Sequence, residues 1–176
     1  MMMWVFGYGS LLWNPGFDAA ESVVARLDGY ARSFCMRSIH HRGSEADPGL
    51  VLALDAAPGA SCTGLALAVR AREEDRVLAD LRARELISSA YYEDHVPLAL
   101  EDGRRVDALA YIINRDHRQY CGGLPLEEQA QIIATATGGR GPNRDYLFNT
   151  EAHLQAMGLG DADLTWLAAR VRALCG

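Results

Sequence analysis

The hydrophobic period of this chain changes along its length, and that change limits the possible folds more than any other feature. In the first two thirds most apolar runs are short and bounded by turn residues, a pattern typical of β-strands. Strands are expected at residues 5–8, 23–27, 31–38, 50–54, 63–69, 91–100 and 104–113. The last third has helical spacing, with helices expected at residues 125–136, 145–157 and 163–174. Strands first and helices afterwards predict an α+β fold rather than an alternating parallel sheet.

One helix interrupts the strand region, over residues 72–87. Val77, Leu78 and Leu81 recur there at the spacing that places apolar side chains on one face. Counting about 100° per residue from Val77 puts Glu85 between Leu81 and Leu78 on that face. The pattern therefore places a carboxylate inside an apolar stripe.

The pattern leaves two interpretations of Glu85 open. In the more common one, the side chain reaches solvent at the helix end or pairs with Arg82 or Arg84. In the other, the carboxylate faces an apolar interior, where desolvation disfavours the charged form and raises the pKa of a carboxyl group. Such a group can both take and return a proton, which is what a general acid-base catalyst needs.

The stretch WVFGYGSLLW, residues 4–13, places a small polar tripeptide between two apolar runs. The simpler interpretation is a turn after a buried strand, because Gly7 and Gly9 can adopt backbone conformations closed to other residues. The alternative is a cradle of backbone N–H groups for an anionic ligand. Ser10 would then act through its backbone or as a hydrogen-bonding group.

Two familiar motifs do not fit this stretch. The dinucleotide fingerprint G-x-G-x-x-G needs a glycine where Leu12 stands. The nucleophile elbow G-x-S-x-G needs glycines where Tyr8 and Leu12 stand, which argues against Ser10 as a hydrolase nucleophile.

Composition removes further classes of function. With 176 residues and 49% hydrophobic content, residues 1–176 are expected to form one domain. The net charge of -6 argues against a nucleic-acid groove. All 17 basic residues are arginine, which excludes a P-loop lysine, a Schiff base and a Ser-Lys dyad.

The cysteines and histidines do not predict a metal site. The four cysteines are scattered without a CxxC pair, and His40-His41 has no third ligand at suitable spacing. We expect reduced thiols in the cytoplasm, with no signal peptide and no membrane-spanning segment.

Five segments in order resemble the ChaC family of γ-glutamylcyclotransferases, enzymes that act on glutathione. These segments are FGYGSLLWNPGF, LDGYARSF, HHRG, RARELISSAY and GPNRDYLF, and the similarity extends over residues 4–174. The RARE tetrad followed by Tyr91 is closer to the bacterial branch than to the branch in which glycines follow the glutamate. The acidic position of the family, Glu85, is intact.

The resemblance implies a γ-glutamylcyclotransferase-like fold, a small mixed β-barrel with surrounding α-helices, and no cofactor or metal. It also implies cleavage of glutathione to 5-oxoproline and cysteinylglycine, in which the α-amine of the γ-glutamyl group attacks its own γ-carbonyl. Glu85 would be the catalytic base and then the acid. The resemblance assigns substrate contacts to the turn residues Tyr8, Gly9, Ser10 and Leu11.

Two residues of the later segments keep two interpretations each. Tyr146 either adds a hydroxyl to the substrate pocket or packs in the core beside Leu147. Arg42 of the HHRG segment either meets a substrate carboxylate or is a solvated loop residue.

Two other functions remain open from the sequence: a cyclotransferase for another γ-glutamyl amine, and a binding module that has lost activity. The expected partner is a small-molecule substrate, with no nucleic acid and no membrane. The sequence does not predict the oligomeric state.

Overall fold

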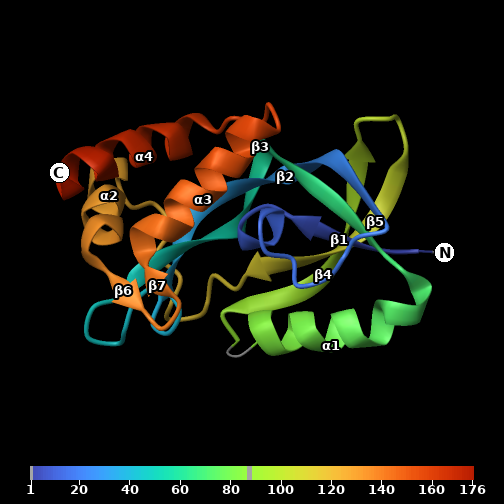
Figure 1. Cartoon of the computed structure of the whole chain (residues 1–176), viewed down its shortest axis with the longest axis horizontal. Helices are drawn as coiled ribbons and strands as arrows, with labels where there is room; N and C mark the ends of the chain where they lie inside the picture. Colours follow the sequence, from blue (N-terminus) through green and yellow to red (C-terminus); the bar gives the residue numbers. More distant parts are fainter. Residues whose placement is uncertain (1, 87–88) are drawn as a thin grey trace. The chain divides into compact units, whose positions relative to one another are not determined.

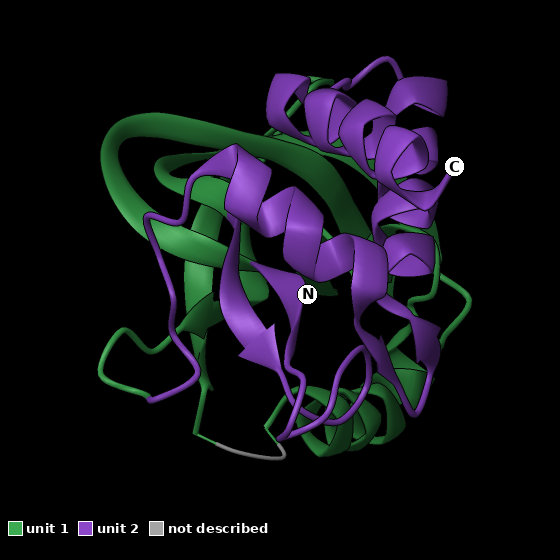
Figure 2. Ribbon diagram, turned by 90° about the vertical axis from the view of Figure 1, so that its left-hand side faces the viewer, with its two compact units in different colours: residues 1–32, 53–117 green, residues 33–52, 118–176 purple. Residues whose placement is uncertain are grey.

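The computed structural model describes residues 2–86 and 89–176 (Figure 1). The chain divides into two compact units, which Figure 2 shows in different colours. The first unit comprises residues 1–32 and 53–117, and the second comprises residues 33–52 and 118–176. Each unit is described by itself below.

Five strands of the described chain form a closed barrel in the order β1-β3-β2-β4-β5, with an additional pairing between β3 and β5. Their bounds are β1 Met3–Gly7, β2 Glu21–Ser38, β3 Gly49–Val69, β4 Tyr91–Leu100 and β5 Arg105–Ile113. β1 runs antiparallel to β3 and parallel to β5, so the barrel is mixed. The α+β class and the mixed barrel expected from the sequence are both confirmed.

The number of strands differs from the sequence-based prediction. Residues 23–27 and 31–38 belong to the single strand β2, and residues 50–54 and 63–69 to the single strand β3. The presumed turns contain Gly29 and Gly59, whose φ angles are +88° and +84°. A glycine takes this left-handed conformation at little cost, so the strand continues through a local distortion instead of ending. The prediction of two separate strands in place of β2, and of two in place of β3, was wrong.

The hairpin and the first helix follow the prediction closely. β4 and β5 pair antiparallel from Tyr91↔Ile113 to Ala99↔Arg105. The connection contains Gly103, which has a φ of +94°. Helix α1 covers Glu74–Glu85 after a short 3-10 turn, η2, at Ala71–Glu73. Ile87, the expected end of this helix, lies outside the described residues.

The core of the first unit holds the opening turn and α1 against the same strands. Eight buried residues form this cluster: Val5, Leu11, Leu67, Val69, Val77, Leu81, Leu109 and Tyr111. Leu11 comes from the turn after β1, whereas Val77 and Leu81 are the buried positions of α1. Full burial of one such side chain contributes about 1.5–3 kcal/mol. The shared core therefore places the turn and α1 in the same part of the unit.

The second unit contains the helices of the last third. Their bounds are α2 Leu126–Thr135, α3 Asn143–Ala156 and α4 Ala162–Cys175, with the short strands β6 Thr137–Gly138 and β7 Gly141–Pro142 between α2 and α3. The Asp161 side chain caps α4 by accepting hydrogen bonds from the N–H groups of Asp163 and Leu164. No helix among the described residues combines the length and hydropathy needed to cross a membrane.

Candidate active site

The turn after β1 is a single 3-10 turn, η1, at Ser10–Leu12. Its own hydrogen bonds use the N–H groups of the later residues. Leu12 donates to the Gly9 carbonyl at 2.9 Å, and Asn14 donates to the Ser10 carbonyl at 2.7 Å. Neither Gly7 nor Gly9 has a positive φ, but Gly9 has φ −139° and ψ −118°, outside both the extended and the helical regions, as the sequence suggested for this glycine. At Gly7 the requirement is space, because an added Cβ would lie 3.3 Å from the Leu11 Cβ.

The N–H groups at the start of the turn differ from the later ones in their hydrogen bonding. Among residues 2–86 and 89–176, no backbone acceptor is found for the N–H groups of Gly9, Ser10 and Leu11. Consecutive backbone N–H groups of this kind form concavities that bind anions. These three N–H groups are therefore available to a ligand, and the cradle suggested by the sequence stays a prediction.

The side chain of Tyr8 is part of the barrel core. It is 7% exposed, and its hydroxyl donates to the Tyr111 carbonyl at 2.9 Å. The Tyr8 carbonyl accepts a hydrogen bond from the Arg32 Nε at 2.7 Å. These contacts fix the position of Tyr8, the residue before Gly9 and the turn.

Glu85 is the last residue of α1, eight positions after Val77 and four after Leu81, which are both buried. Its side chain is 16% exposed, and its Oε1 lies 3.5 Å from the Arg84 Nε. Both interpretations of Glu85 thus find support, because the carboxylate is largely buried and is also paired with an arginine. That arginine is Arg84.

Arg84 also contacts the turn. Its Nη2 donates to the Ser10 Oγ at 2.7 Å, and its Nη1 donates to the Asn14 carbonyl at 2.6 Å. The Ser10 hydroxyl therefore acts as a hydrogen-bond acceptor. Through Arg84, the first unit brings Ser10 and Glu85 into one cluster.

Sequence reasoning missed a second polar group beside this cluster. Arg82 donates two hydrogen bonds to Glu93, at 3.0 and 2.9 Å, and Tyr111 donates its hydroxyl to the same carboxylate at 2.9 Å. The Arg82 bonds lower the pKa of Glu93, whereas burial and the bond to Glu93 raise the pKa of Tyr111. Glu93 and Tyr111 are direct partners in the β4–β5 register.

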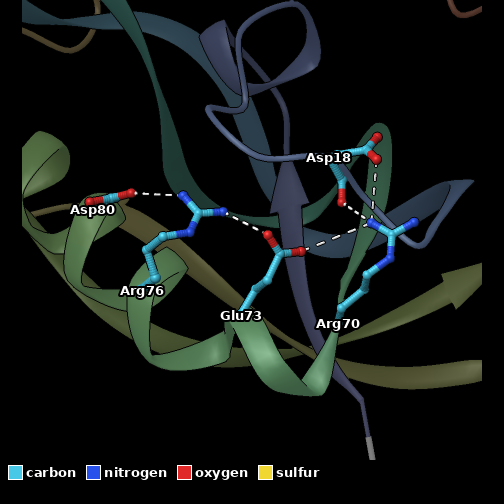
Figure 3. Close-up of polar contacts among 5 residues, drawn as sticks. All are labelled: Asp18, Arg70, Glu73, Arg76 and Asp80. Atoms are coloured by element: carbon cyan, nitrogen blue, oxygen red, sulfur yellow. Dashed lines mark hydrogen bonds and ion pairs between the residues drawn. The ribbon is translucent and has the colours of Figure 1, made fainter.

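The N-terminal end of α1 carries a chain of ion pairs, drawn in Figure 3. Arg76 contacts Glu73 at 3.0 Å and Asp80 at 3.1 Å. Arg70 lies 4.0 Å from Glu73 and 3.4 Å from Asp18. Most of these side chains are well exposed, and such pairs are usually worth about 0–1 kcal/mol each. This network attaches the start of α1 to the segment that follows the turn.

Tyr146 lies in the second unit, on α3. It is 6% exposed, its hydroxyl accepts a hydrogen bond from the Leu52 N–H at 3.2 Å, and its ring meets Phe34 edge-on. These contacts are those of a core residue within this unit. A contact between Tyr146 and substrate stays a prediction.

Arg42 is buried in the second unit, with only 8% of its surface exposed. Its Nη1 donates to the Pro142 carbonyl at 3.2 Å, and its guanidinium lies 5.8 Å from the centre of the Tyr146 ring. Burial lowers the pKa of Arg42. The solvated interpretation of this residue was therefore wrong.

In the described chain, two other kinds of feature could include the predicted site residues: a cavity and a metal site. A cavity of about 310 Å³ in the first unit includes none of them. Its lining residues are Arg26, Asp28, Gly29, Gly59, Ala60 and Ser61. Within residues 2–86 and 89–176, no group of three His, Cys, Asp or Glu side chains is arranged to hold a metal ion.

Comparison with known proteins points to one family. A family model described as ChaC-like protein matches residues 3–174. The glutathione-specific gamma-glutamylcyclotransferase of Escherichia coli (strain K12) is 37% identical over 172 residues, which cover 98% of this chain and 74% of that protein. Gamma-glutamylcyclotransferase 2-3 of Arabidopsis thaliana is 36% identical over 178 residues, covering 98% of this chain and 89% of that protein.

A solved structure supports the fold. The crystal structure of a yeast γ-glutamyl cyclotransferase specific to glutathione matches with a TM-score of 0.88 and 24% identity. The match covers 98% of this chain and 96% of the yeast chain. At this level of identity the likeness establishes the fold alone.

Proposed function

The chain belongs to the ChaC-like protein family, and from this premise we propose that it is a γ-glutamylcyclotransferase that converts glutathione into 5-oxoproline and cysteinylglycine. The names of its E. coli and A. thaliana relatives support the reaction type. The observation that carries the proposal is the Ser10–Arg84–Glu85 cluster, in which a largely buried carboxylate is tied through Arg84 to the turn that the proposal assigns to substrate binding.

The proposed reaction needs one proton acceptor that later becomes a donor. The α-ammonium of the γ-glutamyl group first loses a proton to the Glu85 carboxylate. The freed amine attacks the γ-carbonyl carbon and closes a five-membered ring, which is favoured because both groups belong to one molecule. The bond from that carbon to the cysteinyl nitrogen breaks as this nitrogen takes the proton back from Glu85. The ring nitrogen then gives up its second proton, which ends on the released amine and makes it an ammonium. No water is consumed.

The turn supplies the complementary part of this mechanism. The N–H groups of Gly9, Ser10 and Leu11 would bind the α-carboxylate of the substrate and the oxygen on which negative charge builds. Donors that are already in place cost no reorganisation when the charge develops. Tyr8 supports the turn through its hydroxyl bond to the Tyr111 carbonyl. The mechanism assigns no step to Tyr146.

The proposal also includes the expected single domain, the absence of a cofactor and the cytoplasmic location. Residues 1–176 would act as one domain, and the proton transfers described need no cofactor. All four cysteines are thiols rather than disulfide halves in the described chain. Thiols of this kind fit the reducing cytoplasm.

The direct test is to incubate the purified protein with glutathione and with γ-glutamyl-alanine, and to measure 5-oxoproline. We expect faster turnover of glutathione, because binding energy from its glycyl carboxylate can position the reacting carbonyl. Treatment with a metal chelator should leave the rate unchanged. Equal or reversed rates would move the function to the wider γ-glutamyl class. No 5-oxoproline from either substrate would favour a binding module.

A further inference from the structure

Arg84 joins groups from two separate segments of the first unit. Its two terminal nitrogens are bound by the turn, Nη1 by the Asn14 carbonyl and Nη2 by the Ser10 hydroxyl. Its remaining nitrogen, Nε, lies 3.5 Å from the Glu85 Oε1. The Arg84 side chain is 16% exposed, as is that of Glu85.

The lengths of these contacts show what orients the guanidinium. The contacts to the turn, at 2.6 and 2.7 Å, are short hydrogen bonds, whereas 3.5 Å to Glu85 is longer than a strong N–H···O bond. The turn therefore fixes the orientation of the Arg84 guanidinium, and the Nε of Arg84 faces the Glu85 carboxylate. A planar fork of donors is particular to arginine, because a lysine ammonium is a point charge on a flexible stem.

Helical spacing alone does not produce the contact between Arg84 and Glu85. Side chains at adjacent positions of a helix do not face each other. Here Glu85 is the last residue of α1, and Arg84 reaches across to the turn. The arrangement depends on the tertiary position of the turn.

Two other charged or titratable groups near Glu85, Arg82 and Tyr111, share a different partner. Arg82 is bound to Glu93, and the Tyr111 hydroxyl donates to the same carboxylate. The charge of Glu85 also contributes to the raised pKa of Tyr111. Of the arginines in the last turn of α1, Arg84 is thus the one placed to act on Glu85.

We propose that Arg84 is a positioning residue that holds the Glu85 carboxylate at a set place relative to the turn and favours its ionised form. This inference rests on the proposed cyclotransferase function. The substrate must be bound by the turn while its amine faces Glu85, so the distance between these two parts determines how often the amine can be deprotonated. A displacement of about 1 Å in such a site can cost about 10²-fold in rate.

The test compares Arg84→Met and Arg84→Lys with the wild type, and uses Arg76→Gln as a control from the exposed end of the same helix. The measurements are kcat, KM and the pH profile of kcat/KM with glutathione, together with thermal melting. Arg84→Met should lower kcat about 10- to 100-fold with a smaller change in KM. The acidic limb of its pH profile should move to higher pH, because a carboxylate that loses a neighbouring cation protonates more readily.

Arg84→Lys separates charge from geometry. It keeps a cation, so the acidic limb should stay close to that of the wild type, but it lacks the fork and should still lose kcat. The control Arg76→Gln should match the wild type in every kinetic measurement. If Arg84→Met does not fold, Arg84→Lys decides the outcome alone.

Two kinds of failure can be told apart. An active wild type whose folded Arg84 variants keep its kcat and its pH profile would overturn the positioning role and leave the proposed function standing. A folded wild type that forms no 5-oxoproline would instead overturn the proposed function and this inference with it.

Discussion

The two ends of α1 carry the same kinds of side chain in different surroundings. In its first two turns, the side chains of Arg76 and Asp80, which Figure 3 draws, are 50% and 65% exposed. At the C-terminal end, those of Arg84 and Glu85 are both 16% exposed, and the arginine is bound to the turn. Water screens the first pair, so it contributes little, whereas the second pair is largely shielded from water. Burial and attachment to the turn distinguish the candidate site from the surface network.

The largest expected effect concerns Glu85. Glu85→Gln keeps the shape of the side chain but cannot take the ammonium proton or return one to the leaving nitrogen. Losing such a group typically costs about 10²- to 10⁴-fold in rate. We expect 5-oxoproline formation from glutathione to fall by at least that factor, with thermal melting and substrate binding close to those of the wild type.

The matched control for this change is Asp80→Asn, an acid-to-amide substitution at an exposed position in the second turn of the same helix. It should leave turnover intact. Near-normal turnover by a well-folded Glu85→Gln protein would remove Glu85 from the mechanism. The two ends of α1 would then be functionally equivalent, contrary to the comparison.

A smaller effect is expected at Ser10. Ser10→Ala removes one anchor of Arg84 but leaves the backbone N–H groups of the turn in place. The loss of one such hydrogen bond corresponds to about 1 kcal/mol, or about a fivefold lower kcat/KM for glutathione. Ser44→Ala is the control, because the Ser44 hydroxyl also accepts a hydrogen bond, from the Asp47 N–H in an exposed loop. Complete inactivity together with a covalent adduct on Ser10 would contradict the cyclisation mechanism.

The ion pair of Arg82 with Glu93 should affect stability rather than catalysis. The pKa of Glu93 is lowered in the folded protein, so its contribution to stability is present above the unfolded pKa and is lost as pH falls through the folded value. Glu93→Gln should therefore lower the free energy of unfolding by about 1 kcal/mol at neutral pH and by little once Glu93 is protonated in strong acid. Urea unfolding of both proteins at neutral and at acidic pH measures this. An equal difference at both pH values would rule out the charge as its cause.

The smallest effect is expected at Arg76. Arg76→Gln removes two ion pairs on the exposed side of α1, at Glu73 and Asp80. Exposed pairs are worth about 0.2–1 kcal/mol and are screened by salt. The melting temperature should fall slightly at low salt and match the wild type at high salt, with unchanged turnover. A loss of turnover in this variant would show that the exposed network also serves the site.

Much of the fold could be predicted because its signals are local. The β4–β5 hairpin and the helices α1, α2, α3 and α4 follow from the spacing of apolar residues and from turn residues between them. The errors occurred where a local signal has two structural outcomes. Gly29 and Gly59 signal turns, but in this barrel they lie inside continuous strands. Whether a strand ends at such a glycine depends on the strands beside it.

In the candidate site, too, some residues could be proposed from the sequence and others could not. Spacing along α1 placed Glu85 beside Val77 and Leu81, and motif resemblance selected the turn, so the amino-acid sequence alone was enough to propose both. The arginine partner could not be chosen, because Arg82 and Arg84 both flank the apolar stripe in sequence. The burial of Arg42 in the second unit was equally invisible in a polar loop sequence.

The sequence by itself determined the α+β class and the family, and it proposed the acidic residue, because each of these depends on residue type and on spacing within short segments. Only the tertiary structure decided that Arg84 meets both Ser10 and Glu85 while Arg82 turns to Glu93. The physical reason is that the contact that orients Arg84 joins segments far apart in the chain. Ser10 and Arg84 are separated by 74 positions, and the packing of the shared core brings them together.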